Sequence, residues 1–139
     1  YGDVVADVRA ELERRVEGLV GAGVDAEHIV LDPGFGFAKR APHSWTLLAR
    51  LDELVALGYP LLVGTSRKRF LGQAVTPQGE DPGPQDRDLV TAATTVLAAA
   101  AGAWCVRVHE VRASADAVRA VAAVAAARAG APPGPQGPP

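Results

Sequence analysis

The chain has 139 residues, of which 48% are hydrophobic, and its formal net charge is −2. This length suits a single domain, and the small net charge excludes the basic surface that a nucleic-acid-binding protein needs. No apolar run reaches the roughly 18 residues of a membrane span, and the single cysteine, Cys105, excludes an internal disulfide framework. We therefore expect a cytoplasmic domain that binds neither nucleic acid nor membranes. Because the chain begins with Tyr1 rather than Met, we expect its natural N-terminus to lie upstream.

Helical and strand-like patterns alternate in the first half of the chain. Apolar residues recur three and four positions apart over the first twenty residues, which predicts a helix that Asp3 caps and Gly21 ends. The residues expected on its buried face are Val5, Val8, Leu12, Val16 and Leu19. The elements predicted after this helix are a strand at 29–32, a helix at 44–57 and a strand at 60–64.

The second half repeats this order after a loop. Residues 76–85 are rich in Pro and Gly, which predicts a loop. The elements expected after it are a helix at 86–101, a strand at 103–108 and a last helix that Ser114 caps and that fades near Arg128. We interpret Arg87 and Asp88, at the start of the first of these helices, as a surface pair.

The end of the chain differs in composition from the rest. Residues 129–139 are almost entirely Gly, Pro and Ala. Such a segment cannot bury enough apolar surface to order itself. We therefore predict a folded domain at 1–128 and a disordered tail at 129–139.

The order of elements predicts an α/β fold. A helix followed by three strand–helix repeats, with no hairpin signal, is typical of a parallel sheet with crossover helices. A complete (β/α)8 barrel takes about 200 residues or more. We therefore expect the C-terminal portion of a TIM barrel, with about three βα units, whose barrel-facing sides would meet water if the chain stood alone. A small open α/β sheet is the alternative.

The first of three polar clusters stands where the strand at 29–32 ends, which is where parallel α/β proteins carry their chemistry. A carboxylate at Asp32 could accept two parallel hydrogen bonds from an amidine-like ring edge. The alternative is an ordinary helix-cap or turn aspartate. Phe35 and Phe37 alternate with glycines, so we expect one ring to pack inward and the other to face a ligand.

The second and third clusters are cationic. Alternation after the strand at 60–64 places Ser66 and Lys68 on one side and turns Arg67 away, unless these residues form only a solvated basic turn. Arg107 and His109 stand two residues apart at the end of the last strand, so they point the same way and suit a phosphate group. An exposed strand-end pair is the alternative reading.

Other polar residues carry no predicted chemistry. We assign none to His28 or His43, and no set of His, Asp or Glu has metal-ligand spacing. No glycine-rich dinucleotide or Walker-type loop occurs. Cys105 lies in an apolar strand, so we expect an inert thiol.

The three clusters together resemble dihydropteroate synthase. The matching stretches are Asp-Pro-Gly-Phe-Gly-Phe-Ala-Lys at 32–39, Gly-Thr-Ser-Arg-Lys-Arg-Phe-Leu-Gly at 64–72 and Arg-Val-His-Glu-Val at 107–111. The similarity runs from Tyr1 to about Arg128 and is strongest to actinobacterial members. It implies a pterin-binding (β/α)8 barrel of which this chain holds the last three strands.

The resemblance also implies a reaction and a site. The family condenses 4-aminobenzoate with 6-hydroxymethyl-7,8-dihydropterin pyrophosphate, giving dihydropteroate and pyrophosphate for folate biosynthesis. The implied pterin-binding residues are Asp32, Gly64, Lys68 and Arg107. The implied aminobenzoate-binding residues are Phe37 and Ser66. Arg107 and His109 would hold the pyrophosphate, and the implied catalytic residues are Lys68, Arg107 and His109.

Some of the family's features lie outside this sequence. The resemblance implies Mg²⁺ as cofactor, but the metal-ligating Asn belongs to an earlier strand, so no metal ligand is expected here. Ala38 and Glu110 replace a common Gly and Asp without touching an implied contact. The partners that the resemblance implies are the two small-molecule substrates and a second copy in a homodimer. We predict that the 139-residue chain alone is inactive.

Two alternatives to a catalytic dihydropteroate synthase stay open. The chain could belong to a non-catalytic pterin-binding paralogue or partner subunit, whose expected mark would be damaged Lys or Arg clusters. It could also belong to a pterin-dependent methyltransferase, which shares the barrel. The intact clusters at 66–68 and 107–109 favour the pyrophosphate-releasing enzyme.

Overall fold

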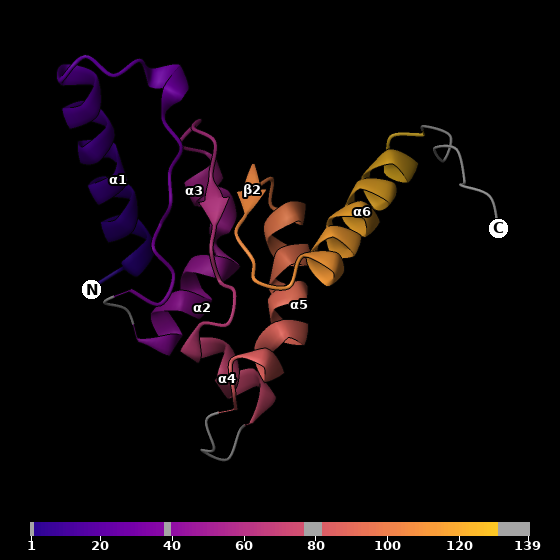
Figure 1. The fold of residues 1–139 in the computed structure, drawn as a ribbon. Coiled ribbons are helices and arrows are strands. Elements are labelled where there is room, and N and C mark those ends of the chain that lie inside the picture. Colours follow the sequence, from indigo (N-terminus) through magenta and orange to yellow (C-terminus); the bar gives the residue numbers. More distant parts are fainter. Residues whose placement is uncertain (1, 38–39, 77–81, 131–139) are drawn as a thin grey trace.

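The computed structural model describes residues 2–37, 40–76 and 82–130, so most of the predicted tail lies outside it. Helices dominate, and a narrow sheet lies between them (Figure 1). The longer helices are α1 (Val4–Gly21), α2 (Ala41–Ala49), α3 (Leu51–Val55), α4 (Arg69–Val75), α5 (Asp88–Ala100) and α6 (Val111–Arg128). The remaining elements are β1 (Leu62–Val63), β2 (Cys105–Val106) and the 3-10 turns η1 (Ala26–His28) and η2 (Gln85–Arg87).

The sheet is parallel, as the repeat pattern predicts. β1 pairs with β2, with Leu62 opposite Cys105. On the other side of β1, Leu31 forms a parallel bridge with Leu61, and the Leu62 N–H donates to the Leu31 carbonyl at 2.8 Å. The strand predicted at 29–32 is therefore present only as this bridge, because its other residues have no ladder partner within the described chain. The three segments end at one edge of the sheet.

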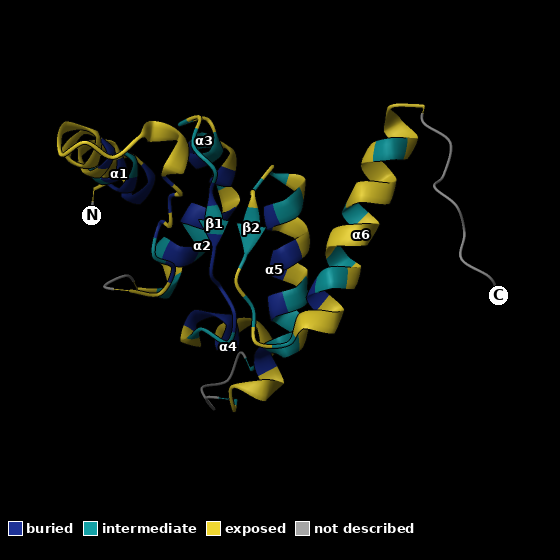
Figure 2. Cartoon of the chain, turned by 45° about the horizontal axis from the view of Figure 1, so that its top comes forward, coloured by how far each residue is buried: buried dark blue, intermediate teal, exposed yellow. Residues whose placement is uncertain are grey.

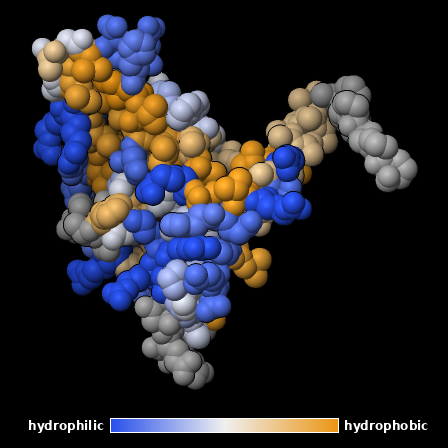
Figure 3. Space-filling view, in the orientation of Figure 1, coloured by the Kyte–Doolittle hydropathy of each residue, from blue (hydrophilic) through white to orange (hydrophobic). Residues whose placement is uncertain are grey.

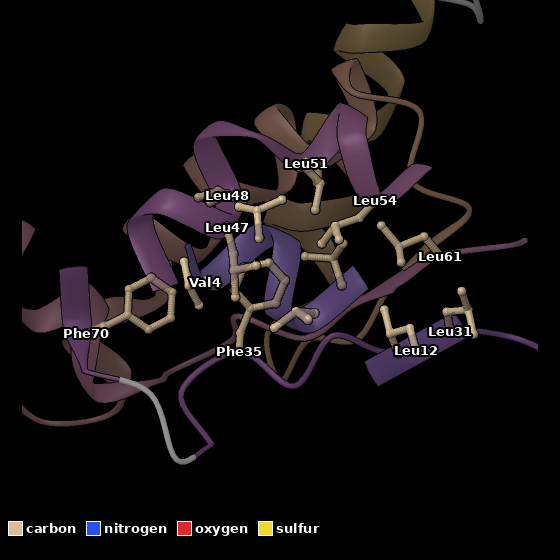
Figure 4. Packing of buried hydrophobic residues seen from close by; sticks show 14 of the residues in the cluster. Val4, Leu12, Leu31, Phe35, Leu47, Leu48, Leu51, Leu54, Leu61 and Phe70 are labelled. Carbon is tan, nitrogen blue, oxygen red and sulfur yellow. The ribbon is translucent and has the colours of Figure 1, made fainter. Parts of the chain in front are cut away.

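The core lies between the sheet and the helices α1, α2 and α3. Leu47, Leu51 and Leu54 are at most 1% exposed, and Phe35 joins them from the loop after the first strand segment. Figure 4 shows Phe35 and Leu47 together in this cluster. Burying one such side chain contributes about 1.5–3 kcal/mol to folding, so these residues fix how the helices stand against the sheet.

The first helix begins where its cap predicts. One oxygen of Asp3 accepts hydrogen bonds from the backbone N–H groups of Val5 at 2.9 Å and Ala6 at 3.3 Å. Four of the five residues expected on the inner face are buried, but Leu19 is 45% exposed. It lies in the last turn of α1, beyond the part of the helix that packs on the core.

Two helix predictions are wrong in detail. The helix expected at 44–57 starts earlier, at Ala41, and breaks at Arg50, whose backbone leaves the helical region. Arg50 Nη1 there donates to both oxygens of Asp3 at 3.0 Å, a contact that no local pattern could indicate. The cap of α6 is Glu110, not Ser114, because the Glu110 carboxylate accepts from two N–H groups of the first turn.

The last helix covers α5 and is itself little covered. α6 lies along α5, and Figure 2 shows most of it exposed. Ser114 is its one buried residue. Within the described ranges, no helix combines the length and hydropathy that a transmembrane span needs.

Candidate functional site

The loop after Leu31 brings Asp32 and two aromatic rings to the end of the sheet. Gly34 and Gly36 have φ of 69° and 72°, values that L side chains rarely adopt, so the glycines allow this tight path. Asp32 Oδ1 accepts the Gly34 N–H at 2.8 Å, which is a turn contact. A carboxylate has about four acceptor positions, so Asp32 keeps capacity for a ligand.

One of the two phenylalanines of this loop packs inward, as expected, and the other is exposed. Phe35 is 1% exposed and stacks on Phe70 with ring centroids 6.5 Å apart. Phe37 is 59% exposed, and Lys68 Nζ lies 3.6 Å from its ring centroid. A cation over an aromatic face is favourable, so each side chain limits where the other can lie.

Lys68 approaches the loop because a glycine makes room. A Cβ at Gly36 would stand 3.3 Å from Lys68 Cδ, closer than side chains normally pack. Burial lowers the pKa of the Lys68 ammonium, the charge of Arg107 lowers it further, and Asp32 acts in the opposite direction. The three charged groups, one from each strand end, are therefore close enough to influence one another.

Arg107 reaches across the sheet from the last strand. Its guanidinium lies over Gly64, where an added Cβ would come within 3.2 Å of Arg107 Nη2. The backbone N–H of Arg107 donates to the Val63 carbonyl at 3.0 Å, which extends the pairing of β1 and β2. Gly64 thus permits the close passage of a cation at the end of β1.

Ser66 and His109 are joined directly. Ser66 Oγ lies 2.8 Å from His109 Nδ1, and it accepts the His109 backbone N–H at 3.0 Å. Ser66 is 5% exposed. One serine hydroxyl therefore contacts both the ring and the backbone N–H of His109 and limits the orientation of each.

Pairwise contacts link the three strand ends: Lys68 with Phe37, Arg107 with Gly64, and Ser66 with His109. We call this group the strand-end site; it consists of Asp32, Phe37, Gly64, Ser66, Lys68, Arg107 and His109. A pocket of about 470 Å³ opens beside Lys68, lined by Gly36, Ala41, Arg67, Lys68, Arg69, Phe70 and Gln73. Figure 3 shows hydrophilic residues gathered on the lower part of the molecule and a hydrophobic face above them. Two cations, Lys68 and Arg107, and the carboxylate of Asp32 are the chemical groups that can bind an anion beside a polar ring.

The interpretation of Arg87 and Asp88 as a surface pair is wrong. Arg87 is 6% exposed, and its Nη1 donates to the Arg67 carbonyl at 2.8 Å. Asp88 instead accepts Arg67 Nε and Nη2, each at 2.8 Å. A sequence signal for these contacts exists in the threonines of the Ala-rich helix α5. All three threonines of α5, Thr91, Thr94 and Thr95, are buried polar residues at helical spacing.

The described residues offer no metal centre. No group of three or more His, Cys, Asp or Glu side chains in the described ranges could hold a metal ion. The ring of His28, a residue without predicted chemistry, lies 3.8 Å from an Asp25 oxygen and 3.9 Å from a Glu27 oxygen on the surface. The thiol of Cys105 is half-buried rather than fully buried.

Comparison with known proteins places this chain in a family. The family model described as pterin binding enzyme matches residues 1–109. The dihydropteroate synthase of Mycobacterium leprae is 53% identical over 120 residues, which cover 86% of this chain and 42% of that protein. The enzyme of the same name from Escherichia coli K12 is 40% identical over 119 residues, 86% of this chain and 40% of that protein. The chain thus spans about 40% of the length of these relatives.

Solved structures agree with the sequence comparison. The dihydropteroate synthase of Yersinia pestis, solved with a sulfonamide drug, superposes with a TM-score of 0.85 at 38% identity, covering 91% of this chain and 44% of that one. The Xanthomonas albilineans enzyme in complex with 7,8-dihydropteroate gives a TM-score of 0.84 at 40% identity, covering 91% and 47%. The expected fold class, the C-terminal portion of a pterin-binding TIM barrel, is confirmed, as is the resemblance to dihydropteroate synthase. The chain belongs to the pterin binding enzyme family.

Proposed function

We propose that the protein to which these residues belong is a dihydropteroate synthase. In this proposal it joins 4-aminobenzoate to 6-hydroxymethyl-7,8-dihydropterin pyrophosphate in folate biosynthesis. The observation that carries the proposal is the parallel pairing of three segments, which bring Asp32, Lys68 and Arg107 to the same edge of the sheet. The dihydropteroate synthases similar to this chain support it.

The pterin would lie between Asp32 and Lys68. The Asp32 carboxylate suits the N–H and NH₂ edge of a 2-aminopyrimidinone, since both of its oxygens can accept. The Lys68 ammonium would donate to a ring nitrogen or carbonyl. Gly64 leaves the end of β1 open, and Arg107, which lies over Gly64, would run along the pterin face.

The pyrophosphate would be held by Arg107 and His109. In the reaction the amine nitrogen of 4-aminobenzoate attacks the exocyclic methylene carbon of the pterin. A C–N bond forms, the C–O bond to pyrophosphate breaks, and the amine loses one proton. Charge gathers on the leaving pyrophosphate, and preorganised cationic donors stabilise this charge best. No covalent bond to the protein is needed, because the residues position and neutralise.

The aminobenzoate would enter beside Phe37 and Ser66. The exposed ring of Phe37 offers an apolar face next to Lys68. Ser66, whose hydroxyl meets His109, would lie near the aminobenzoate carboxylate. These assignments place the two substrates on either side of the Lys68 side chain.

The resemblance implies a Mg²⁺ cofactor and a homodimer. The described residues do not fit a Mg²⁺ site by themselves, so no step is derived through the metal. A cytoplasmic homodimer, implied by the resemblance, is tested by light scattering of the purified protein. A monomer at working concentration would contradict the dimer without affecting the proposed reaction.

Calorimetry separates the proposed function from its alternatives. Pterin pyrophosphate should bind the complete protein, and Asp32→Asn should weaken this binding by about tenfold to a hundredfold, the usual effect of losing a hydrogen bond to a charged group. Adding 4-aminobenzoate should then release pyrophosphate. Binding without release would indicate a non-catalytic paralogue. Preference for methyl-tetrahydrofolate over the pyrophosphate would indicate a methyltransferase.

A further inference from the structure

The backbone of Arg67 adopts a conformation that its side chain disfavours. Its φ is 57°, and it is the one non-glycine residue with positive φ in the ranges that the structure describes. The Lys68 N–H donates to the Thr65 carbonyl at 3.1 Å, so residues 65–68 form a turn with Arg67 in third place. Turns with positive φ at the third residue normally use Gly or Asn. Contacts from elsewhere must therefore hold Arg67.

The start of α5 supplies these contacts at three points. The Arg67 N–H donates to Thr91 Oγ1 at 3.2 Å, and the Arg67 carbonyl accepts from Arg87 Nη1 at 2.8 Å. The Arg67 guanidinium pairs with both oxygens of Asp88, at 2.8 Å each. The Thr91 hydroxyl donates to the Arg87 carbonyl at 2.9 Å, which closes the network. Backbone and side chain of a single residue are thus fixed by one helix end.

The residues on either side of Arg67 belong to the strand-end site. Ser66 contacts His109, and Lys68 lies over Phe37. We propose that Arg87, Asp88 and Thr91, which we call the α5 clamp, position Ser66 and Lys68 by holding Arg67 in its left-handed conformation. The clamp residues are positioning residues that touch no substrate. Their effect on turnover rests on the function proposed above.

A competing explanation is that Asp88 acts through its charge. The Asp88 carboxylate also interacts electrostatically with His109, so its loss could disturb the site without any change at Arg67. The two explanations differ in what they predict for residue 67 itself. If the backbone of residue 67 matters, activity should depend on how easily the residue at this position adopts positive φ. If only charge matters, activity should depend on whether the guanidinium is present.

Two substitutions at residue 67 separate these explanations. Arg67→Gly and Arg67→Ala both remove the guanidinium, but glycine adopts positive φ freely. In the complete protein, kcat/KM for dihydropteroate formation should be roughly five- to thirtyfold lower for Arg67→Ala than for Arg67→Gly, the factor that corresponds to the cost of the left-handed conformation for an L residue. Equal values for the two variants would overturn the proposal.

Asp88→Asn is tested both in the unchanged protein and in the Arg67→Gly variant. Asp88→Asn alone should lower kcat/KM by about tenfold to a hundredfold, as small misplacements in active sites do. Combined with Arg67→Gly, it should have less than about a twofold further effect, because its partner is already gone. The same loss in both backgrounds would overturn the proposal and place the effect of Asp88 on His109.

The control is an ion pair of the same kind on the surface. Arg119 Nη1 lies 2.7 Å from Asp116 on α6, with both side chains exposed. Asp116→Asn makes the same chemical change as Asp88→Asn and should alter kcat/KM by less than about twofold. A loss at Asp116 equal to that at Asp88 would overturn the assignment of a special role to the clamp.

Crystal structures test the clamp without turnover. If the unchanged protein formed no dihydropteroate, the proposed function would fail, but the clamp would still predict a geometry. In Arg67→Ala and Asp88→Asn, Lys68 Nζ should leave its place 3.6 Å from the Phe37 ring centroid. Nζ remaining there in both variants would overturn the clamp.

Discussion

Lys68 lies between groups from the other two strand ends of the strand-end site. It carries a positive charge next to Arg107 and over the ring of Phe37. Burial first, and Arg107 second, lower the pKa of its ammonium below the ordinary 10.5, while Asp32 partly restores it. The protein thus brings together two cations that repel each other. Such a pair is stabilised when an anionic ligand binds between them.

This electrostatic balance predicts how binding depends on pH. Lys68 is charged below its lowered pKa and neutral above it, so affinity for pterin pyrophosphate should fall as pH rises, starting at a lower pH than a lysine with the ordinary pKa of 10.5 would give. Calorimetry across alkaline pH measures this fall. In Lys68→Arg, whose guanidinium stays charged, the fall should disappear. An identical fall in both proteins would contradict the role given to Lys68.

Ser66 controls the orientation of His109. Because its hydroxyl meets both the ring and the backbone N–H of His109, Ser66→Ala should weaken pyrophosphate binding by about two- to tenfold, the effect of one ordinary hydrogen bond. Ser114→Ala, the same change at a buried serine of α6, is the control and should leave affinity unchanged. Unchanged affinity in Ser66→Ala would show that His109 needs no such support.

Helix α5 also holds the sheet through a pair of buried hydroxyls. Thr65 Oγ1 lies 2.8 Å from Thr94 Oγ1, and the Thr94 hydroxyl donates to the Thr91 carbonyl at 2.9 Å. Since Thr94 has already used its proton, Thr65 must be the donor of the pair. The turn that follows β1 is therefore bonded to α5 at Thr65 as well as at Arg67.

The direction of this hydrogen bond predicts unequal mutations. Thr94→Val leaves the buried Thr65 hydroxyl without its acceptor and should lower the free energy of unfolding by about 1–3 kcal/mol. Thr65→Val leaves Thr94 bonded to Thr91 and should cost less, about 0.5–1.5 kcal/mol. Urea unfolding of the complete protein measures both. A larger loss for Thr65→Val would contradict the assigned direction.

The order of elements could be predicted because it depends on local patterns. Helical periodicity, the Asp3 cap and the parallel arrangement are all present in the structure. The break at Arg50 and the cap at Glu110 could not be predicted, because the first coincides with a contact 47 residues away and the second uses a residue type that rarely caps helices. As a helix N-cap, serine is preferred over glutamate, so residue type alone favours Ser114 over Glu110. The observed start of α6 at Val111 makes Glu110 the cap.

The site also has some features that could be predicted from the sequence and others that could not. That Asp32, Lys68 and Arg107 lie near one edge of the sheet could be predicted, because each stands at or shortly after the end of an apolar parallel strand. The positive φ of Arg67 could not, since nothing in the sequence around it calls for one. The burial of Arg87 was equally hidden, because an arginine at a helix start is normally solvated. Both depend on how α5 packs against the turn after β1.

The molecule as a whole presents an apolar face that a single small domain would not be expected to expose. Figure 3 shows a hydrophobic band across the upper part of the molecule. Exposed apolar residues on and near the first strand segment include Val24 and Val30, which are 38% and 43% exposed. Large exposed apolar areas usually mark a surface that is covered in the functional protein. Relatives more than twice as long as this chain supply further residues that could cover it.

This exposed face predicts that the 139-residue chain does not work alone. Supplied by itself with both substrates, it should form no dihydropteroate. Supplying the remaining part of the protein as a separate polypeptide should restore product, measured by chromatography. A steady rate from the chain alone would contradict this prediction.

The rate of pyrophosphate release by the complete protein tests the strand-end site most directly. With pterin pyrophosphate and 4-aminobenzoate, one pyrophosphate should appear for each dihydropteroate, and Arg107→Met should lower kcat by about a hundredfold or more, as the loss of a preorganised charge-stabilising donor does. Arg119→Met, the same change on the surface of α6, should leave kcat unchanged. Full activity in Arg107→Met would contradict the proposal that the reaction takes place at the strand-end site.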